Sequence, residues 1–305
     1  MTGEREKSGE FHLLNGIWDF RFDDENAGEN EKWYEGFESD LQIRVPFTYE
    51  TELSNIRDET RHDNVWYHRT VEVDASRLKD SRYVIHFEGS DYLTRLWVNG
   101  RYAGSHRGGY VRFSFDITQL VKDGKNSLTV KVEDSFDTQQ PRGKQRWKDL
   151  SFGCWYVQTT GIWKTVWAEY VPEISLVNVK MTPDCEADRL NLELDVRAPK
   201  DRFNGELMVE TTVSFSGQLI SRTFTAVVNG HINSCVDLAV QTPEGFAHQV
   251  RCWSPARPDL YDILFRITDK GAVLDEVGSY FAMREIRIDG SNILLNGSPL
   301  YQRLI

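Results

Sequence analysis

The sequence lacks any long apolar run. No stretch approaches the roughly 18 consecutive apolar residues that a membrane-spanning helix needs, so we expect no membrane segment. The N-terminal MTGEREKSGEF has no apolar core of the kind that a secretory signal requires. Together these two absences predict a cytoplasmic protein.

Motifs built on cysteine, histidine and glycine are also missing. The four cysteines (Cys154, Cys185, Cys235 and Cys252) include no C-x-x-C pair, and the seven histidines show no metal-ligand spacing. Glycine-rich phosphate loops and the G-x-S-x-G nucleophile motif are absent as well. We therefore predict no metal, no cofactor and a reduced chain, with a Cys235–Cys252 disulfide as the less favoured alternative.

Basic residues are outnumbered by acidic ones. The 36 lysines and arginines and the 47 acidic residues give a formal net charge of -11, which repels phosphate backbones and anionic lipid headgroups. The richest basic cluster, residues 142–148, is flanked by Asp134, Asp137 and Asp149, so it forms a mixed polar loop. We expect neither nucleic acid nor a membrane surface as a partner.

What the sequence contains in abundance is the alternating pattern of β-strands. Apolar side chains occupy every second position in four stretches, which are residues 128–132, 190–196, 207–215 and 261–267. Asn-Gly pairs at 99–100, 229–230 and 296–297 lie between apolar flanks and predict two-residue hairpin turns. Only Glu29 to Phe37 offers a short helical stretch. The predicted fold is all-β.

Aromatic content divides the 305 residues into two blocks. The first, residues 1–172, holds eight of the nine tryptophans, whereas the second, residues 173–284, has regular short strands and only Trp253. We predict a larger, jelly-roll-like β-sandwich followed by an immunoglobulin-like β-sandwich. A tail, residues 285–305, ends in a hairpin-like piece.

The tryptophans of the first block are expected in the core. Large aromatic side chains dominate the interiors of β-sandwiches, so we favour core packing over sugar stacking for Trp66, Trp97, Trp163 and Trp167. Trp163 and Trp167 are four residues apart, which would place them on one face of one strand.

Several stretches, in order along the chain, resemble family 2 glycoside hydrolases. NVWYHRTVEV (64–73), FEGSDYLTRLWVNGRYAGSHRGGYVRFSFDIT (87–118) and TTGIWKTVWAEYV (159–171) resemble the family's sugar-binding jelly roll. WSPARPDLYDI (253–263) is similar to the end of its immunoglobulin-like domain, and FAMREIRIDGSNILLNGSPLYQRLI (281–305) resembles the start of its catalytic (β/α)8 barrel. The resemblance covers nearly the whole chain after about residue 12.

The resemblance implies a retaining glycosidase of the β-galactosidase type, whose two catalytic glutamates belong to the barrel. A barrel takes about 250 residues of alternating strands and helices, and the sequence has no such region. We therefore expect no catalytic residue and no activity in this chain, and a β-galactoside-type carbohydrate as the partner of the whole protein. The Asn30-Glu31 pair lies in a polar run and is expected to be a solvated loop.

Loops of the family's jelly roll reach the rim of the active site, which implies two candidate segments. Asn64 falls where the family's β-galactosidases carry an asparagine that contacts the sugar; a turn-forming asparagine before a strand is the equal alternative. The second segment, residues 134–155, is a long polar loop. It supplies the other substrate-binding candidates, which are Asp137, Arg142, Lys144, Gln145 and Trp147. The alternative is a loop that packs against the barrel or a neighbouring subunit.

Other functions fit the same features. The β-glucuronidases and β-mannosidases of the family share this architecture, and substrate choice lies mainly in the barrel. A free-standing carbohydrate-binding module and a structural interaction protein also remain open. An apolar patch normally covered by the barrel would favour a homo-oligomer.

Overall fold

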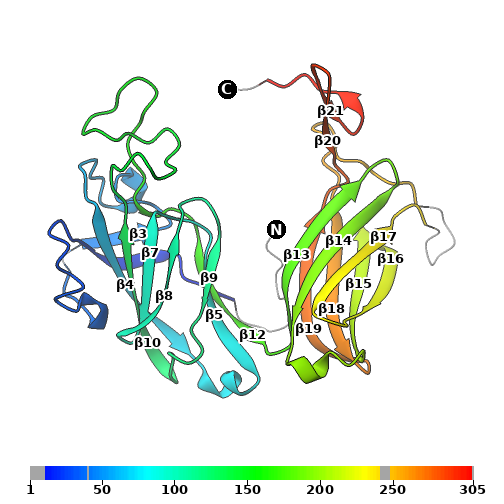
Figure 1. Cartoon of the computed structure of the whole chain (residues 1–305), viewed down its shortest axis with the longest axis horizontal. Coiled ribbons are helices and arrows are strands. Elements are labelled where there is room, and N and C mark those ends of the chain that lie inside the picture. The colour runs from blue at the N-terminus through cyan, green and yellow to red at the C-terminus, as the bar shows by residue number, and fades with distance from the viewer. Residues whose placement is uncertain (1–10, 40, 241–247, 304–305) are drawn as a thin grey trace. The chain divides into compact units, whose positions relative to one another are not determined.

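The computed structural model describes residues 11–39, 41–240 and 248–303. The chain forms two compact units, residues 10–171 and the residues from 172 onward. Nearly all regular structure is β-strand (Figure 1), which confirms the all-β prediction. Within the described ranges, no helix combines the length and the apolar character that crossing a bilayer requires.

The first unit is a sandwich of two main antiparallel sheets. The larger sheet has the strand order β3-β2-β4-β10-β7-β8, the smaller has the order β1-β12-β5-β9, and β6 pairs with β11. The strands are β1 (Phe11–Leu13), β2 (Gly16–Phe22), β3 (Leu41–Val45), β4 (Asn64–Val73), β5 (Ser81–Phe87), β6 (Ser90–Asp91), β7 (Leu93–Val98), β8 (Arg101–Arg107), β9 (Phe113–Asp116), β10 (Gly124–Glu133), β11 (Gly161–Ile162) and β12 (Val166–Pro172).

Alternation along the strands builds the core of this sandwich. On β4, Val65 and Tyr67 are fully buried and pack in the core, together with Leu128, Val130 and Val132 of β10. The register of β4 and β10 pairs Asn64 with Glu133. Asn64 therefore lies beside the point where the chain leaves β10 for its long loop.

Burial is confirmed for Trp66, Trp97 and Trp167, although none of the three packs between the two sheets, whereas Trp163 is only partly buried. Trp66 alternates with core residues on β4, so it lies on the opposite face, where it stacks on Trp97 at 5.4 Å and contacts Trp33. Trp167 is buried, but it stacks on His86 outside the main core. Trp163 lies between β11 and β12 and is only partly buried. The shared strand predicted for Trp163 and Trp167 is therefore wrong.

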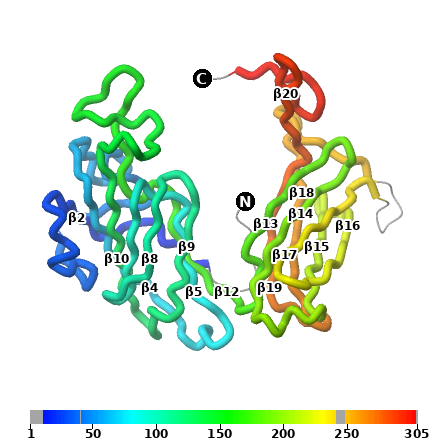
Figure 2. The backbone as a smooth tube through the Cα atoms, viewed as in Figure 1, coloured from blue at the N-terminus to red at the C-terminus, as the bar shows by residue number. Residues whose placement is uncertain are grey.

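The second unit is a smaller sandwich, and Figure 2 traces the chain from β12 into it. Its sheets have the strand orders β13-β14-β17 and β16-β15-β18-β19. The strands are β13 (Ser175–Asp184), β14 (Arg189–Arg197), β15 (Leu207–Phe215), β16 (Gln218–Ala226), β17 (His231–Asp237), β18 (Tyr261–Asp269) and β19 (Ala272–Phe281). The predicted alternation is confirmed on β14, where Leu190, Leu192, Leu194 and Val196 are all buried.

Two of the three Asn-Gly pairs form the predicted hairpins. Asn99-Gly100 joins β7 to β8, and Asn296-Gly297 joins β21 (Asn292–Leu295) to β22 (Ser298–Pro299), each with positive φ at both residues. Asn229-Gly230 instead connects β16 of one sheet to β17 of the other, so the predicted hairpin there is wrong. The expected helical stretch holds one short 3-10 turn, η1 (Trp33–Glu35).

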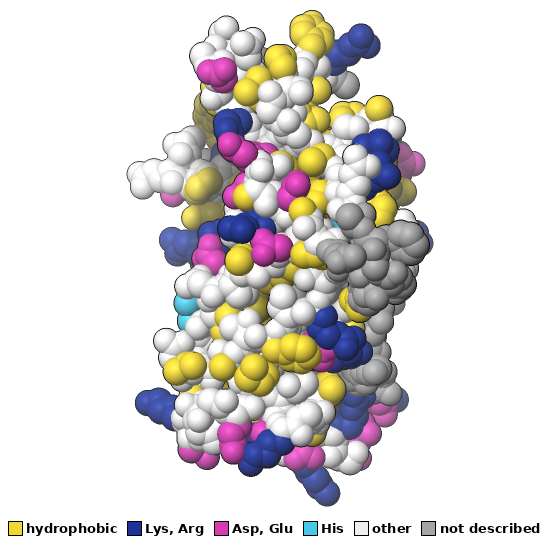
Figure 3. All heavy atoms as spheres, turned by 90° about the vertical axis from the view of Figure 1, so that its right-hand side faces the viewer, with side chains coloured by type: hydrophobic (Ala, Val, Ile, Leu, Met, Phe, Trp, Pro, Cys, Tyr) yellow, Lys and Arg dark blue, Asp and Glu magenta, His cyan; other side chains and the backbone are white. Residues whose placement is uncertain are grey.

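The tail folds into a small three-stranded sheet made of β20 (Ile286–Asp289), β21 (Asn292–Leu295) and β22 (Ser298–Pro299). Ile286, Ile288 and Tyr301 are exposed, Ile288 to 77%. Figure 3 looks at this unit and shows hydrophobic side chains at its upper end, where the tail lies.

Candidate functional site

A long loop, residues 134–160, connects β10 to β11 and extends beyond the sheets of the first unit (Figure 1, green). Its two ends are tied together, because the Thr160 hydroxyl donates to Oδ2 of Asp134 over 3.0 Å. The amide of Asp134 also donates to the carbonyl of Asp63. The loop therefore stands on a closed stem at one end of the sandwich.

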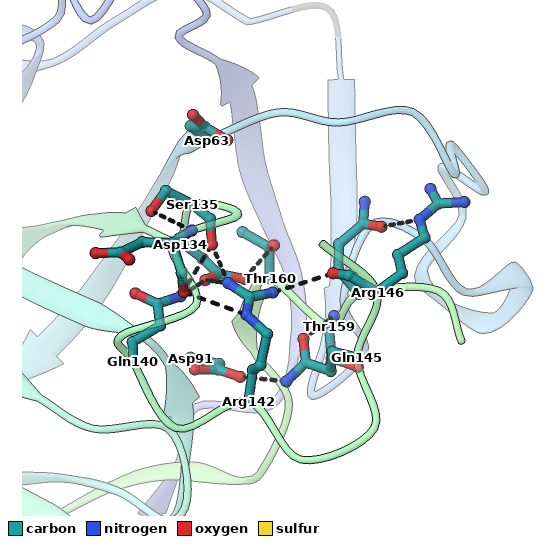
Figure 4. A network of polar contacts seen from close by, with 12 residues as sticks. Asp63, Asp91, Asp134, Ser135, Gln140, Arg142, Gln145, Arg146, Thr159 and Thr160 are labelled. Atoms are coloured by element: carbon teal, nitrogen blue, oxygen red, sulfur yellow. Dashed lines mark hydrogen bonds and ion pairs between the residues drawn. The ribbon is translucent and has the colours of Figure 1, made fainter. Parts of the chain in front are cut away.

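Two buried arginines hold the shape of this loop (Figure 4). Arg142 donates to the carbonyls of Ser135 and Arg146 and lies 3.6 Å from Oδ1 of Asp134. Arg146 donates to Oε1 of Gln158 over 2.8 Å and to the carbonyl of Glu59. Loop carbonyls without strand partners are satisfied in this way, so both arginines position the loop.

Gln145 connects the loop to the sheet. Its amide nitrogen donates to Oδ2 of Asp91 over 2.8 Å and to the Tyr110 hydroxyl over 3.3 Å, while its amide oxygen accepts from the amide of Thr159. Asp91 is 3% exposed and lies against Gly109. The Gln145 side chain thus holds the Asp91 carboxylate, the Tyr110 hydroxyl and the end of the loop at Thr159 in place.

Three carboxyl groups are buried at the base of the loop. Burial, followed by the charge of Asp134, raises the pKa of Asp91 to about 7. Burial also raises the pKa of Glu50 to about 7, and Oε2 of Glu50 has no hydrogen-bond partner within the described residues. The pKa of Asp134 is raised by burial, although the Arg142 charge opposes that rise. A proton held by any of these groups near neutral pH reduces their mutual repulsion.

One cavity, which we term the aromatic cavity, has a volume of about 330 Å³. Tyr110 and Tyr156 are 49% and 59% exposed, and the indole nitrogen of Trp163 donates to the carbonyl of Gly109 over 2.8 Å. The residues that line the cavity are Asp91, Tyr110, Arg142, Gly143, Lys144, Gln145, Tyr156, Val157, Thr159 and Trp163. It combines apolar ring surface with a few fixed polar groups, an arrangement typical of small-molecule sites.

A second cavity, the polar cavity, has a volume of about 320 Å³. It opens where β4 and β7 begin and β10 ends, next to the stem of the loop. Its lining residues are Asn26, Asp63, Asn64, Tyr92, Leu93, Arg107, Glu133, Asp134, Ser135, Asp137 and Gln140.

The predicted site residues fall into three groups. Arg142, Lys144 and Gln145 line the aromatic cavity. Asn64 and Asp137 line the polar cavity, where Asp137 is exposed and Asn64 is the first residue of β4. Trp147 lines neither cavity and packs on Phe152 and Trp155 at 4.9 and 4.5 Å.

Sequence reasoning named three of the ten residues that line the aromatic cavity, and those it missed include Asp91, Tyr110, Tyr156 and Trp163. Residues 163–165 lie between the end of β11 and the start of β12, so Trp163 is outside the strand that carries Trp167. The glycines that shortly precede these aromatic residues, Gly161 before Trp163 and Gly108-Gly109 before Tyr110, were the only sequence features that suggested a change of chain direction there.

The residues the structure describes contain no group of three or more His, Cys, Asp or Glu side chains that could hold a metal ion. Glu50 does not line either cavity and accepts from the amide of Thr160. Glu31 of the Asn30-Glu31 pair is exposed and accepts from the indole of Trp33. Neither glutamate lines the aromatic cavity or the polar cavity.

Two protein-family models match the chain. The model described as "Glycosyl hydrolases family 2, sugar binding domain" matches residues 11–166, and the model "Glycosyl hydrolases family 2" matches residues 174–284. These ranges cover the two sandwiches described above.

Curated relatives and solved structures agree with these matches. A β-galactosidase of Thermoanaerobacter pseudethanolicus is 26% identical over 78% of the chain and 31% of the relative. A β-glucuronidase of Paenibacillus borealis is 23% identical over 94% of the chain and 48% of the relative. The structure of a Ruminococcus gnavus β-glucuronidase in complex with D-glucaro 1,5-lactone shares the fold, with a TM-score of 0.73 and 23% identity over 96% of the chain and 48% of that structure. The chain spans less than half the length of each of these proteins.

Proposed function

The chain belongs to family 2 of the glycosyl hydrolases, and on that basis we propose that it is the non-catalytic part of a retaining β-galactosidase-type enzyme. The absence of a barrel from the described residues supports this proposal, since the family's chemistry needs two facing carboxylates. The match of Asn64 to a sugar-contacting asparagine supports the galactoside.

The aromatic cavity carries the proposal that this chain contributes to sugar binding. Trp163 and Tyr156 offer ring faces for the apolar face of a pyranose, and Asp91 and Gln145 offer hydrogen-bonding groups to its hydroxyls. Asn64 and Asp137 would extend the sugar-binding surface along the polar cavity.

Calorimetric titration of the chain with galactose and with glucuronate tests this binding. We expect millimolar galactose binding that Trp163→Ala or Tyr156→Ala weakens about fivefold, since one lost stacking ring costs roughly 1 kcal/mol. Tyr280→Ala is the matched control, because Tyr280 is equally exposed (56%) and lies on β19 of the other unit. Equal weakening by all three variants, or no binding of either sugar, would contradict the role of the cavity.

A hydrolysis assay tests whether catalysis requires the barrel. The chain alone should not hydrolyse a chromogenic β-galactoside, whereas the protein extended through a barrel should cleave it faster than the glucuronide or the mannoside. Turnover by the chain alone would defeat the proposal.

A β-glucuronidase is the second candidate. The P. borealis relative carries that name. In addition, Lys144 lines the aromatic cavity and Arg107 lines the polar cavity, and neither forms an ion pair within the described residues. Such cations would favour the carboxylate of a uronic acid. Preferential binding of glucuronate, lost in Lys144→Met, would establish this alternative.

We also propose a cytoplasmic location and contact between the tail and the barrel. The four cysteines are free, as a reducing compartment would leave them. Ile286, Ile288 and Tyr301 present the apolar surface that a barrel or a second copy of the chain would cover. Cell fractionation tests the location, and sedimentation of the chain with and without Ile288→Lys tests self-association.

A further inference from the structure

The chain contains five Asn-Gly steps, at residues 15–16, 99–100, 204–205, 229–230 and 296–297. In such a step the backbone amide of the glycine lies close to the side-chain carbonyl of the asparagine, and the glycine has no Cβ atom to hinder its approach. The amide can therefore attack the side chain where both groups are free to move. The fold decides at which of the five steps they are.

Three of the asparagine side chains are fixed by the fold, those of Asn15, Asn99 and Asn296. In each of them Oδ1 accepts from a backbone amide of another segment, over 2.9 to 3.0 Å. Nδ2 also donates, to a hydroxyl in Asn15 and to a backbone carbonyl in the other two, over 2.8 to 3.3 Å. A side chain bonded through both atoms cannot turn toward the following glycine until these bonds break.

Asn229 is exposed, but the glycine after it is held in place. Gly230 is buried, and its carbonyl accepts from the amide of Val196 over 2.7 Å. A Cβ atom on Gly230 would lie 2.9 Å from the carbonyl oxygen of Val196. The peptide that would have to move toward the Asn229 side chain is therefore fixed against β14.

Asn204 and Gly205 are both exposed, in the turn between η4 (Lys200–Arg202) and β15. Within the described part of the chain, Glu206 is the only hydrogen-bond partner of the Asn204 side chain. Its amide donates to Oδ1 over 3.0 Å, and its carboxylate accepts from Nδ2 over 3.2 Å. Beyond its chain neighbours, no described atom lies within 4 Å of a Cβ built on Gly205. This step alone combines a locally bonded side chain with an unobstructed glycine.

We propose that Asn204 is a site of spontaneous deamidation, at which the chain acquires aspartate or isoaspartate with time. The amide nitrogen of Gly205 loses its proton to solvent and attacks Cγ of Asn204. A C–N bond closes a succinimide ring, and the side-chain nitrogen takes up a proton and leaves as ammonia. Water then opens the ring: cleavage at Cγ gives aspartate, and cleavage at the backbone carbonyl gives isoaspartate. Nothing is oxidised or reduced.

The surroundings of Asn204 favour the attack. Negative charge develops on Oδ1 as the ring closes, and the amide of Glu206 already donates to that oxygen. The carboxylate of Glu206 is paired with Lys270 over 2.9 Å, which offsets its own negative charge near the turn. The turn thus supplies a donor for the intermediate without a fold that holds the side chain back.

The product alters the entry to β15. Either product adds a negative charge beside Glu206, and isoaspartate also leads the main chain through the side-chain carbon. Asn204 lies outside β15, so the pairing of this strand with β16 and β18 should persist. The modification is confined to the second unit and does not depend on sugar binding.

Incubation of the wild-type chain at mildly alkaline pH, followed by digestion and mass spectrometry, is the direct test. We expect the peptide that carries Asn204 to gain the mass difference between an amide and an acid and to separate into aspartate and isoaspartate forms. Asn15, Asn99 and Asn296 react only after local opening, so their peptides should convert at least about tenfold more slowly. An unchanged Asn204 peptide, or equally fast conversion at any of these three positions, would overturn the proposal.

The same incubation in denaturing urea shows whether the fold makes this selection. All five steps should then convert at similar rates, because each asparagine is followed by glycine and no tertiary contact holds its side chain. A preference for Asn204 that persists in the unfolded chain would contradict the protection assigned to the fixed asparagines.

Charge supplies a further readout. On isoelectric focusing, the incubated wild-type chain should gain a more acidic form. Asn204→Gln should remove most of it, because glutamine would have to close a larger ring, whereas the matched control Asn229→Gln, at the other exposed position, should retain it. An acidic form of unchanged intensity in Asn204→Gln would contradict the assignment, and if a variant fails to fold, the wild-type peptide map decides alone.

Discussion

A Cβ atom on Gly109 would lie 2.3 Å from Oδ1 of Asp91. The φ of Gly109 lies outside the left-handed range, so it is the carboxylate rather than the backbone that requires a glycine here. Asp91 is buried and bonded to Gln145, so a shift of its carboxylate would disturb that hydrogen bond. This close approach fixes one wall of the aromatic cavity.

Gly109→Ala should therefore displace Asp91 and destabilise the first unit by about 1–3 kcal/mol, the usual cost of overpacking. Urea unfolding followed by tryptophan fluorescence measures the change, because eight of the nine tryptophans lie within residues 1–172. The double mutant Asp91→Ala/Gly109→Ala is the control. If the glycine substitution costs the same with and without the carboxylate, the two residues are not coupled.

Arg146→Met should destabilise the first unit by roughly 3 kcal/mol. The substitution leaves the carbonyl of Glu59 and the amide oxygen of Gln158 without their charged donor at a site where Arg146 is 4% exposed. Arg57→Met is the matched control. The side chain of Arg57 is 71% exposed, so its loss should barely change the free energy of unfolding. Equal denaturation midpoints for the two variants would refute the role given to Arg146.

The stability of the first unit should fall as pH rises from about 4 to 7. The folded pKa values of Glu50 and Asp91 are about 7, above the ordinary range of carboxyl groups, so in this window the folded chain keeps protons that the unfolded chain releases. The free energy of unfolding would drop by up to about 1.4 kcal/mol per pH unit for each group and level off above the folded pKa.

Glu50→Gln should flatten this dependence, because glutamine has the shape of the protonated acid and does not titrate. Glu52→Gln is the control at an exposed position two residues away. Urea midpoints between pH 4.5 and 8 give the slopes, and an unchanged slope in Glu50→Gln would remove Glu50 as a cause.

Asp23→Ala should open the tryptophan cluster on the outer face of the larger sheet. Asp23 accepts from the amides of Ala27 and Gly28 and from the indole of Trp66 over 2.7 to 3.0 Å, and it thereby holds the covering segment. Losing these bonds should cost about 2–4 kcal/mol and red-shift the fluorescence. The neighbouring Glu25→Ala, at an exposed position, should leave the spectrum unchanged.

Alternation and turn chemistry were sufficient to predict the fold class. Period-two patterns fix which side chains face a core, and they do so for Leu190 and Leu192 as well as for Val130. They cannot say whether the opposite face meets water or a second layer. Trp66 and Trp97 therefore proved to be buried, but under the segment held by Asp23 rather than between the sheets.

The candidate loop was predictable, but its geometry was not. Length and polarity indicated residues 134–155, whereas nothing local indicates that Gln145 contacts Asp91 or that Arg142 satisfies loop carbonyls. Such pairings between distant residues depend on where the strands end in space.

The hydrogen bond between Thr160 and Asp134 has a consequence for how such proteins diversify. Because the stem is closed beneath the loop, a segment of different length or composition can be exchanged above it without shifting the register of β10 or β11. Grafting the corresponding loop of another family member onto this stem should transfer its ligand preference while leaving the melting temperature of the sandwich nearly unchanged. The closed stem would thus allow loops of different sequence to be exchanged on an unchanged sandwich.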